Sequence, residues 1–468
     1  MRSDNPAEIA LSNDLEVRDE RGLIAQDYFD QVEAAIEQRD RELLLELTQD
    51  LHEADMGDLI EAFGPRDRQD FLDLLAEDFD FSALTELDDS LRLKIVDALP
   101  NEVVAEGVKE LDSDDAVIIL EDMEEEDREE ILAQLPVMDR IQLKRSLDFP
   151  EDSAGRRMQT EFIAVAPFWT VGQTIDYMRE TIDLPDEFNQ IFVIDPAHRL
   201  LGSVSLDTLL RSRRPTKITE IMDETRHYVT AEEDQEEVSR LFERYDLLSA
   251  AVVDESERLV GVLTIDDIVD VIHEEAEEDI KRLGGVGDEE ITDTVIETVR
   301  SRFTWLAVNL LTAILASWVI ALFDSTIEQM VALAVLMPIV ASMGGNAATQ
   351  TMTVAVRALA TQEIDSFNMM RVVSREVLVA LLNGAAFAVL VGAIAGFWFE
   401  NFDLGLVIGA ALVINLFFAG LSGILIPLGL EKLGADPAVA SSVFITTVTD
   451  VVGFFAFLGL AAWWFGLV

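Results

Sequence analysis

An aspartate stands inside an otherwise uncharged stretch near the C-terminus, ITTVTDVVGFFAFLGLAAWW, where its carboxylate could attract a cation. A carboxylate at the centre of a lipid bilayer costs roughly 3 kcal/mol by insertion scales, so such residues are rare and usually belong to an ion pathway. The apolar segment 438–467 is long enough to span the hydrocarbon core. At about 1.5 Å per residue, Asp450 lies roughly 18 Å from the start of that segment, which is mid-membrane depth.

Polar residues also interrupt a second apolar segment, MPIVASMGGNAATQTMTVAVRALA. Pro338 and the pair Gly344 and Gly345 weaken a helix locally, and the amides of Asn346 and Gln350 follow them. Polar oxygen atoms at membrane depth are tolerated only against protein or water, where they can face a hydrated ion. The alternative is close helix packing, which small residues also favour.

A row of acids forms the third candidate site, in TIDDIVDVIHEEAEEDIKRLGGV. Spacings of three or four place Asp267, Asp270, Glu274, Glu277 and Glu278 on one side of a helix, with Glu275 and Asp279 in the neighbouring row. Like charges at this spacing destabilise an isolated helix. Either salt and water screen them, or divalent cations bridge this helix to other acidic surfaces.

Five apolar runs of spanning length follow Arg302, at 303–323, 330–356, 377–399, 404–430 and 438–467. Arginines precede the first run and occupy the loop between the second and third, whereas the loops after the first and third carry only acids. By the positive-inside rule, the large N-terminal region is cytoplasmic and the C-terminus lies outside. The chain is therefore expected to be a multi-pass protein of the cell membrane.

The 468-residue chain carries a net charge of −56, of which −51 lies in the first 300 residues. Such an acidic surface excludes nucleic acid as a partner and attracts cations. Lysine is scarce, with six against 28 arginines, and an acidic, lysine-poor surface suggests a salt-loving organism. The absence of cysteine removes thiolate metal sites and cysteine catalysis.

The region before the spans divides into a helical part and a repeated part. In 23–147, apolar residues recur at helical spacing between breaks at Pro65, Pro100 and Pro136, which predicts a small superhelical domain. IFVIDPAHRLLGSVSLDTLL (191–210) then repeats as AAVVDESERLVGVLTIDDIV (250–269), each copy predicting strand, turn, strand and helix. This repeat resembles a tandem pair of CBS domains, which are small α/β modules that often bind adenine nucleotides.

The order of these parts resembles the MgtE family of magnesium channels. The matching segments are FPEDSAGRRMQTEF (149–162), TIDDIVDVIHEEAEEDIKRLG (264–284), MGGNAATQ (343–350) and GADPAVASSVFITTVTDVVGF (434–454). The resemblance implies a homodimer in the lipid bilayer, with a pore lined by the second and fifth spans of both subunits and Asp450 as its ion-selecting acid. It also implies cytosolic sensor acids at Asp267, Asp270, Glu275, Glu278 and Asp279, and a plug helix that closes the pore when cytosolic Mg²⁺ is high.

The expected mechanism holds a largely hydrated Mg²⁺ between two Asp450 carboxylates, because Mg²⁺ gives up its waters reluctantly. The residues expected to line the pore are Gly344, Gly345, Asn346, Thr349, Gln350, Thr446 and Gly453. Asp114 and Asp115 are candidate sensor acids in the helical part. Mg²⁺ is thus both the transported and the regulatory ion, and ATP is a candidate ligand of the CBS pair.

The expected domains are a disordered N-terminus (1–22), a helical acidic N domain (23–150), tandem CBS domains (151–271), a plug or connecting helix (272–300) and a five-helix transmembrane domain (301–468). Two alternative functions stay open: a cation-coupled secondary transporter of divalent metals, and a membrane-anchored CBS nucleotide sensor. An enzyme and a protein substrate are not expected, because no P-loop, nucleophile elbow or metal-hydrolase motif occurs.

Overall fold

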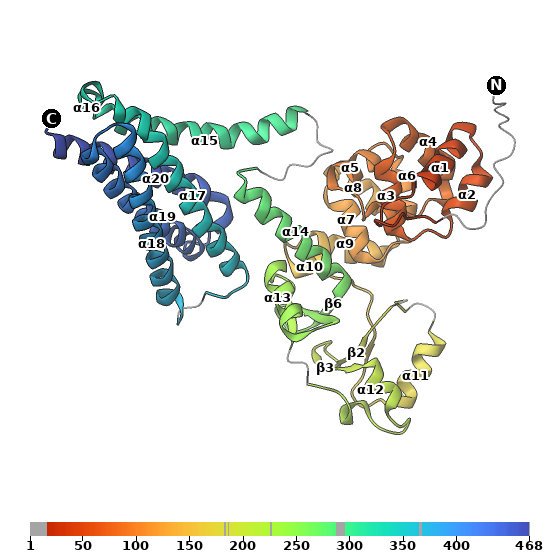
Figure 1. Ribbon diagram of the computed structural model, residues 1–468. Helices are drawn as coiled ribbons and strands as arrows, with labels where there is room; N and C mark the ends of the chain where they lie inside the picture. The colour runs from red at the N-terminus through yellow and green to blue at the C-terminus, as the bar shows by residue number, and fades with distance from the viewer. Residues whose placement is uncertain are drawn as a thin grey trace, which may run out of the picture. The chain divides into compact units, whose positions relative to one another are not determined.

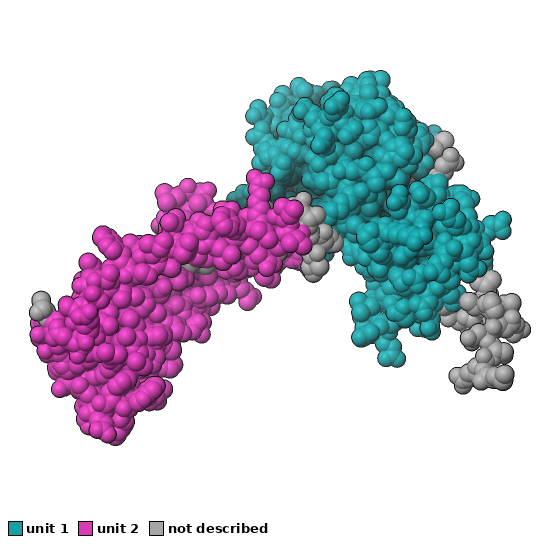
Figure 2. Space-filling view, turned by 90° about the horizontal axis from the view of Figure 1, so that it is seen from above, with its two compact units in different colours: residues 1–272 teal, residues 273–468 magenta. Residues whose placement is uncertain are grey.

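The computed structural model describes residues 16–181, 184–185, 187–224, 227–286, 295–364 and 367–467. It divides into two compact units, Met1–Ile272 and His273–Val468 (Figure 2). The first unit contains the acidic helical region and both copies of the repeat, and the second contains the apolar helices. All five described helices that are long and apolar enough to cross a membrane lie in the second unit, as predicted.

The regular elements of the first part of unit 1, as far as its residues are described, are all helices, as predicted (Figure 1). Its elements are α1 (Gln26–Gln38), α2 (Arg41–Thr48), α3 (Glu53–Ala62), α4 (Pro65–Leu75), η1 (Ala76–Asp78), η2 (Phe81–Leu84), α5 (Asp89–Val96), α6 (Asn101–Val108), α7 (Ser113–Glu121), α8 (Glu125–Gln134) and α9 (Val137–Leu147). The helices are short, and together they bury apolar side chains such as Phe71, Leu84 and Leu120 in one shared core.

The three prolines mark helix starts. Pro65 is the first residue of α4, and Pro100 and Pro136 are the N-caps of α6 and α9. Proline is tolerated at these positions because the first backbone N–H groups of a helix have no intrahelical partner. The predicted breaks therefore coincide with the N-termini of α4, α6 and α9.

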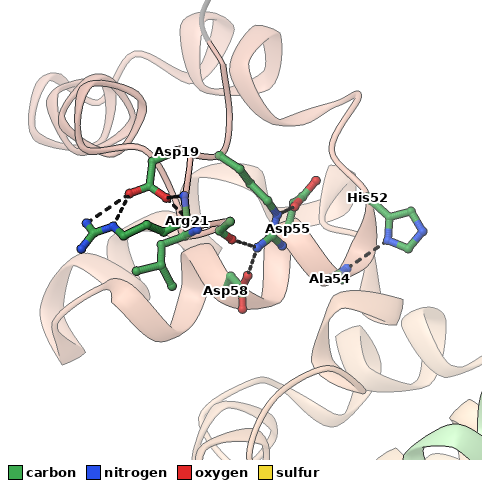
Figure 3. A network of polar contacts seen from close by, with 9 residues as sticks. Asp19, Arg21, His52, Ala54, Asp55 and Asp58 are labelled. Carbon is green, nitrogen blue, oxygen red and sulfur yellow. Dashed lines mark hydrogen bonds and ion pairs between the residues drawn. The ribbon is translucent and has the colours of Figure 1, made fainter.

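Residues 16–22 fall in the stretch expected to be disordered, yet they form a turn that is fastened to α3. Arg18 pairs with Asp55 at 2.5 Å and with Asp58 at 2.7 Å, and its backbone bridges to Ile24. Figure 3 shows this network, in which Asp19 also accepts a hydrogen bond from the side chain of Arg21. His52 caps α3 by accepting a hydrogen bond from the backbone N–H of Ala54. The remainder of the expected disordered stretch, residues 1–15, lies outside the described residues.

The repeat forms two three-stranded sheets of identical topology, in which the first two strands are parallel and the last two antiparallel. The first contains β1 (Ala164–Val165), β2 (Gln190–Ile194) and β3 (Leu200–Ser205), and the second contains β4 (Tyr228–Thr230), β5 (Ser249–Val253) and β6 (Leu259–Thr264). The accompanying helices are α10 (Ala154–Arg157), α11 (Val171–Glu180), α12 (Leu206–Arg211), η3 (Ile218–Glu220), α13 (Gln235–Tyr245) and α14 (Ile265–Leu283).

The two sheets contact each other at equivalent positions. The amide of Gln190 donates 2.9 Å hydrogen bonds to the backbone oxygen and to the hydroxyl of Ser249, its counterpart in the other copy. Apolar residues from both copies, including Phe192 and Ala251, form one buried cluster. The two copies thus pack as a pair, which confirms the predicted tandem α/β arrangement.

Unit 2 contains five helices that are long and apolar enough to cross a membrane, as predicted. Its elements after α14 are α15 (Val295–Ala321), α16 (Asp324–Gln329), α17 (Ala332–Ala360), α18 (Met369–Trp398), α19 (Phe402–Lys432) and α20 (Pro437–Phe465). The central helix is α19, because it is the most buried of the five and packs against α17, α18 and α20. Gly392 of α18 faces Gly405 of α19 so closely that a side chain at either position would meet the other backbone.

Candidate functional site

Asp450 lies on α20 with its side chain half-buried. No residue in the described part of the chain forms a hydrogen bond or an ion pair with this carboxylate. Thr446, one turn earlier on the same side of α20, is exposed. An unpaired acid in an apolar helix requires water, a cation or a second chain beside it, because lipid offers no hydrogen bonds.

The polar residues of α17 form a stripe on the exposed side of that helix. Asn346, Thr349 and Gln350 are exposed, and Thr353 continues the stripe one turn later. Helix α17 packs directly against α20, so both candidate pore helices are neighbours within one chain. A polar stripe of this length in a spanning helix cannot face hydrocarbon at low cost.

The glycines expected to line the pore occupy different surroundings. Gly345 has open space beside its Cα atom, whereas Gly344 and Gly453 are buried and face the side chain of Asn415 on α19. Both glycines make room for the side chain of Asn415, and for Gly344 this agrees with the packing alternative considered for the second apolar segment. The lining of a pore by the seven residues stays a prediction.

The C-terminal end of α14 is fastened to the start of α20. Arg282 pairs with Glu278 one turn earlier and with Asp436, the N-cap of α20. The other oxygen of Asp436 accepts from the backbone N–H of Ala438 at 2.7 Å. Leu283 packs against an apolar cluster of α17, α19 and α20 that contains Ala348, Met352, Val356, Ala419, Ala438 and Ile445.

Three carboxylates gather in unit 1 where α7 meets the beginning of α14. Asp114 is buried at 7% exposure, and its Oδ1 has no hydrogen-bond partner among the described residues. Burial, followed by the charge of Asp267, raises the pKa of Asp114 well above its usual value. The same causes raise the pKa of Asp115 to about 7. Burial also raises the pKa of Asp267 to about 6, although a hydrogen bond from Thr264 opposes the shift.

Helix α7 is held in this place by the segment that precedes the first sheet. The Ser113 hydroxyl donates to Glu161 at 2.7 Å and accepts from the backbone N–H of Thr160 at 2.7 Å. Glu86 lies nearby, and its pKa is raised by burial and then by the charge of Asp270. The structure therefore places Asp267 and Asp270, which the sequence predicted as sensor acids, near Asp114, Asp115 and Glu86 of the helical region.

The described residues contain no group of three acids or histidines arranged to hold one metal ion directly. Mg²⁺ does not need such a group, because it usually keeps several waters and contacts only one or two carboxylates. A pair of carboxylates can therefore bind a hydrated Mg²⁺ ion. Of the remaining predicted sensor acids, Glu275, Glu278 and Asp279 are half-buried in the part of α14 that belongs to unit 2. Glu278 is engaged by Arg282, as described above.

Known proteins match this chain along most of its length. Residues 51–152 match the family model described as the MgtE intracellular N domain, residues 154–214 and 218–274 match the CBS domain, and residues 337–460 match a divalent cation transporter model named MgtE. A magnesium transporter MgtE of Bacillus subtilis is 30% identical over 413 residues, which are 88% of this chain and 92% of that protein. The chain belongs to the MgtE family of magnesium transporters.

Other MgtE proteins and their parts are also similar. The magnesium transporter MgtE of Thermus thermophilus is 36% identical over 69% of this chain and 72% of its own length. The crystal structure of the cytosolic domain of the Mg²⁺ channel MgtE in complex with ATP is 28% identical, covering 52% of this chain and 99% of that chain with a TM-score of 0.48. The soluble part of a magnesium transporter covers 53% of this chain and 98% of that chain at 25% identity, with a TM-score of 0.49.

The expected resemblance to the MgtE family is therefore confirmed. The family transports magnesium and is not a class of enzyme, and the five spanning helices with a soluble N-terminal region form a multi-pass membrane protein. Two residues that the structure places near the candidate sites of this MgtE protein were not predicted from its sequence. Glu86 stands in TELDDS without any distinguishing pattern, whereas Asn415 is an amide inside the apolar run ALVINLFF and could have been singled out.

The raised pKa of Asp115 makes the stability of the Mg²⁺-free protein depend on pH. A raised folded-state pKa adds stability that is fully present below about pH 4 and is lost as pH rises through about 7. We expect Asp115→Asn to abolish this loss, so that the variant gains on the order of 2 kcal/mol relative to wild type between pH 5 and pH 8. Thermal unfolding of the full chain without Mg²⁺ at both pH values measures the difference.

The matched control for this measurement is Asp73→Asn, at an exposed acid of α4. It should follow the wild-type pH dependence. Equal pH dependence of wild type and Asp115→Asn would contradict the burial of this carboxylate.

Proposed function

We propose that the chain is a Mg²⁺-selective, channel-type importer that is closed by cytosolic Mg²⁺. The single observation that carries the proposal is Asp450, an unpaired, half-buried acid in a spanning helix, with the polar stripe of α17 on the neighbouring helix. A carboxylate at this depth attracts a divalent ion more strongly than a monovalent one, because the Coulomb energy doubles with the charge. The ion keeps its inner waters, which the hydroxyls and amides of Thr446, Asn346, Thr349 and Gln350 can bind.

A homodimer completes the path in this proposal. Among the described residues Asp450 has no polar partner, and the hydrogen bonds of Asn346 and Thr353 stay within α17. In the proposal, a second copy related by a two-fold axis supplies partners from outside the chain. The two Asp450 carboxylates then face each other across the axis and share the hydrated ion. The N-terminal region lies in the cytoplasm and the C-terminus outside, as the arginine distribution indicates.

Closure begins in the acidic cluster of unit 1. Without Mg²⁺, the charge of Asp267 adds to burial in raising the pKa values of Asp114 and Asp115, which is a sign of repulsion between these carboxylates. Hydrated Mg²⁺ ions that bridge these acids remove the repulsion and hold α14 against α7. The Mg²⁺-free state, in which the carboxylates repel each other, and the Mg²⁺-bound state, in which they are bridged, are the two states of the switch.

The other end of α14 supports its role as the plug. Arg282 and Leu283 contact the first residues of α20 and the apolar cluster between α17, α19 and α20. An ordering of α14 by Mg²⁺ is thus passed to the helices that carry the proposed path. Rising cytosolic Mg²⁺ closes the importer in this scheme, which gives feedback control of uptake.

Electrical recording of purified protein in a bilayer with a Mg²⁺ gradient tests the proposal. The reversal potential should follow the Mg²⁺ gradient alone. A reversal potential that shifts with an imposed proton or sodium gradient would establish the cation-coupled transporter instead. The membrane-anchored nucleotide sensor would give no Mg²⁺ current, and binding of ATP by the CBS pair, which stays a prediction, is measured by titration calorimetry.

A further inference from the structure

A buried amide joins the two helices that carry Asp450 and the polar stripe. Asn415 lies in the middle of α19 with 0% exposure, and its Nδ2 donates a 2.8 Å hydrogen bond to the backbone oxygen of Val340 on α17. Its Oδ1 is fully buried and has no hydrogen-bond partner in the part of the chain that the structure describes. An apolar side chain of the same size would avoid the cost of this unpaired oxygen, so packing alone does not explain the amide.

Two glycines enclose the amide from opposite helices. A Cβ atom at Gly344 of α17 would lie 2.2 Å from Nδ2 of Asn415, and one at Gly453 of α20 would lie 2.7 Å from the same atom. Both distances are shorter than real Cβ contacts, so any side chain at either position would displace the amide. Gly453 lies three residues after Asp450 on the same helix. The space that holds the Asn415 amide is therefore next to the proposed ion path.

We propose that Asn415 is a positioning residue that sets the separation of α17 and α20 at the level of Asp450. The inference rests on the proposed function, because it takes these two helices as the walls of the ion path. The hydrogen bond to Val340 anchors α17 just after Pro338, where the helix lacks one backbone N–H and is more easily bent. Asn415 acts through both helices and does not touch the ion.

The test is Asn415→Leu in the full-length protein, reconstituted in liposomes, with Mg²⁺ flux and thermal unfolding measured in parallel. The half-saturating Mg²⁺ concentration for flux should rise about threefold or more, because a shift of roughly 0.5 Å is enough to weaken a positioned site. The unfolding temperature should stay the same or rise, because leucine removes the unpaired oxygen. A lower unfolding temperature with an unchanged half-saturating concentration would show a merely structural role and overturn the inference.

A second variant keeps the test decisive if Asn415→Leu does not fold. Gly453→Ala retains the amide but presses against it, and its half-saturating concentration should rise in the same direction; no rise in the folded variant overturns the inference. The matched control is Ser422→Ala on α19, whose hydroxyl donates hydrogen bonds of 2.7 and 3.2 Å to backbone oxygens of its own helix, and it should behave as wild type. A wild-type chain without Mg²⁺ flux would overturn the proposed function itself, whereas normal wild-type flux with unchanged variants overturns the inference alone.

Discussion

Asp450→Asn should lower Mg²⁺ flux through the reconstituted protein by about a hundredfold or more. The attraction between a divalent ion and a carboxylate about 5 Å away is roughly 6 kcal/mol at an effective dielectric constant of about 20. If hydration offsets half of this, about 3 kcal/mol remains, which corresponds to a hundredfold change in occupancy. The carboxylate has no partner among the described residues, so the substitution removes charge without breaking an internal bond. Flux of Mg²⁺ into liposomes that contain a fluorescent Mg²⁺ indicator measures the effect.

Two further variants separate the charge of Asp450 from general effects. Asp450→Glu keeps the charge and should retain more flux than Asp450→Asn. Asp403→Asn neutralises an exposed acid in the first turn of α19 and should conduct as wild type does. Selective Mg²⁺ flux through Asp450→Asn at the wild-type rate would refute the proposed path.

The triple variant Asp267→Asn, Asp270→Asn and Glu278→Gln should need at least about ten times more cytosolic Mg²⁺ for closure. Asp267 lies in the acidic cluster with Asp114 and Asp115, and its neutral form can no longer hold a bridging ion. A loss of about 1.4 kcal/mol of ion binding already corresponds to the tenfold shift. The measurement is the Mg²⁺ concentration on the side of the soluble region that halves the current in a planar bilayer.

The matching control carries the same change in net charge at another place. Glu124, Glu125 and Glu126 are exposed at the start of α8, and their replacement by glutamine should leave the closing concentration unchanged. If both triple variants shift closure equally, the effect belongs to overall charge and the acidic cluster has no special role.

The sequence was most informative where a property repeats along the chain. Five long apolar runs predicted the spanning helices, and the repeated segments 191–210 and 250–269 predicted two equal sheets. Both predictions succeed because the period of two in a strand and the length of a span are local properties. Helix bounds in the acidic region followed from Pro65, Pro100 and Pro136 for a similar reason, since proline restricts its own backbone.

Contacts between distant residues could not be predicted in this way. Asp114 and Asp267 are 153 positions apart, and only the folding of α7 against the CBS pair brings their charges together. The acid row of α14 was visible from its spacing, but nothing in that row indicates which acid meets which helix. The roles of Gly344 and Gly453 likewise depend on Asn415, a residue of a third helix, and so on tertiary packing alone.

The two CBS copies end in helices of very different length, six residues for α12 and nineteen for α14. The last helix of the second copy therefore continues beyond its module, and its C-terminal part belongs to unit 2. Each residue inserted into a helix turns everything beyond it by about 100° and moves it by about 1.5 Å. The number of residues in α14 is therefore as informative as their identity, because an insertion within α14 would rotate Asp267 at its start relative to Arg282, the residue near its end that pairs with Asp436.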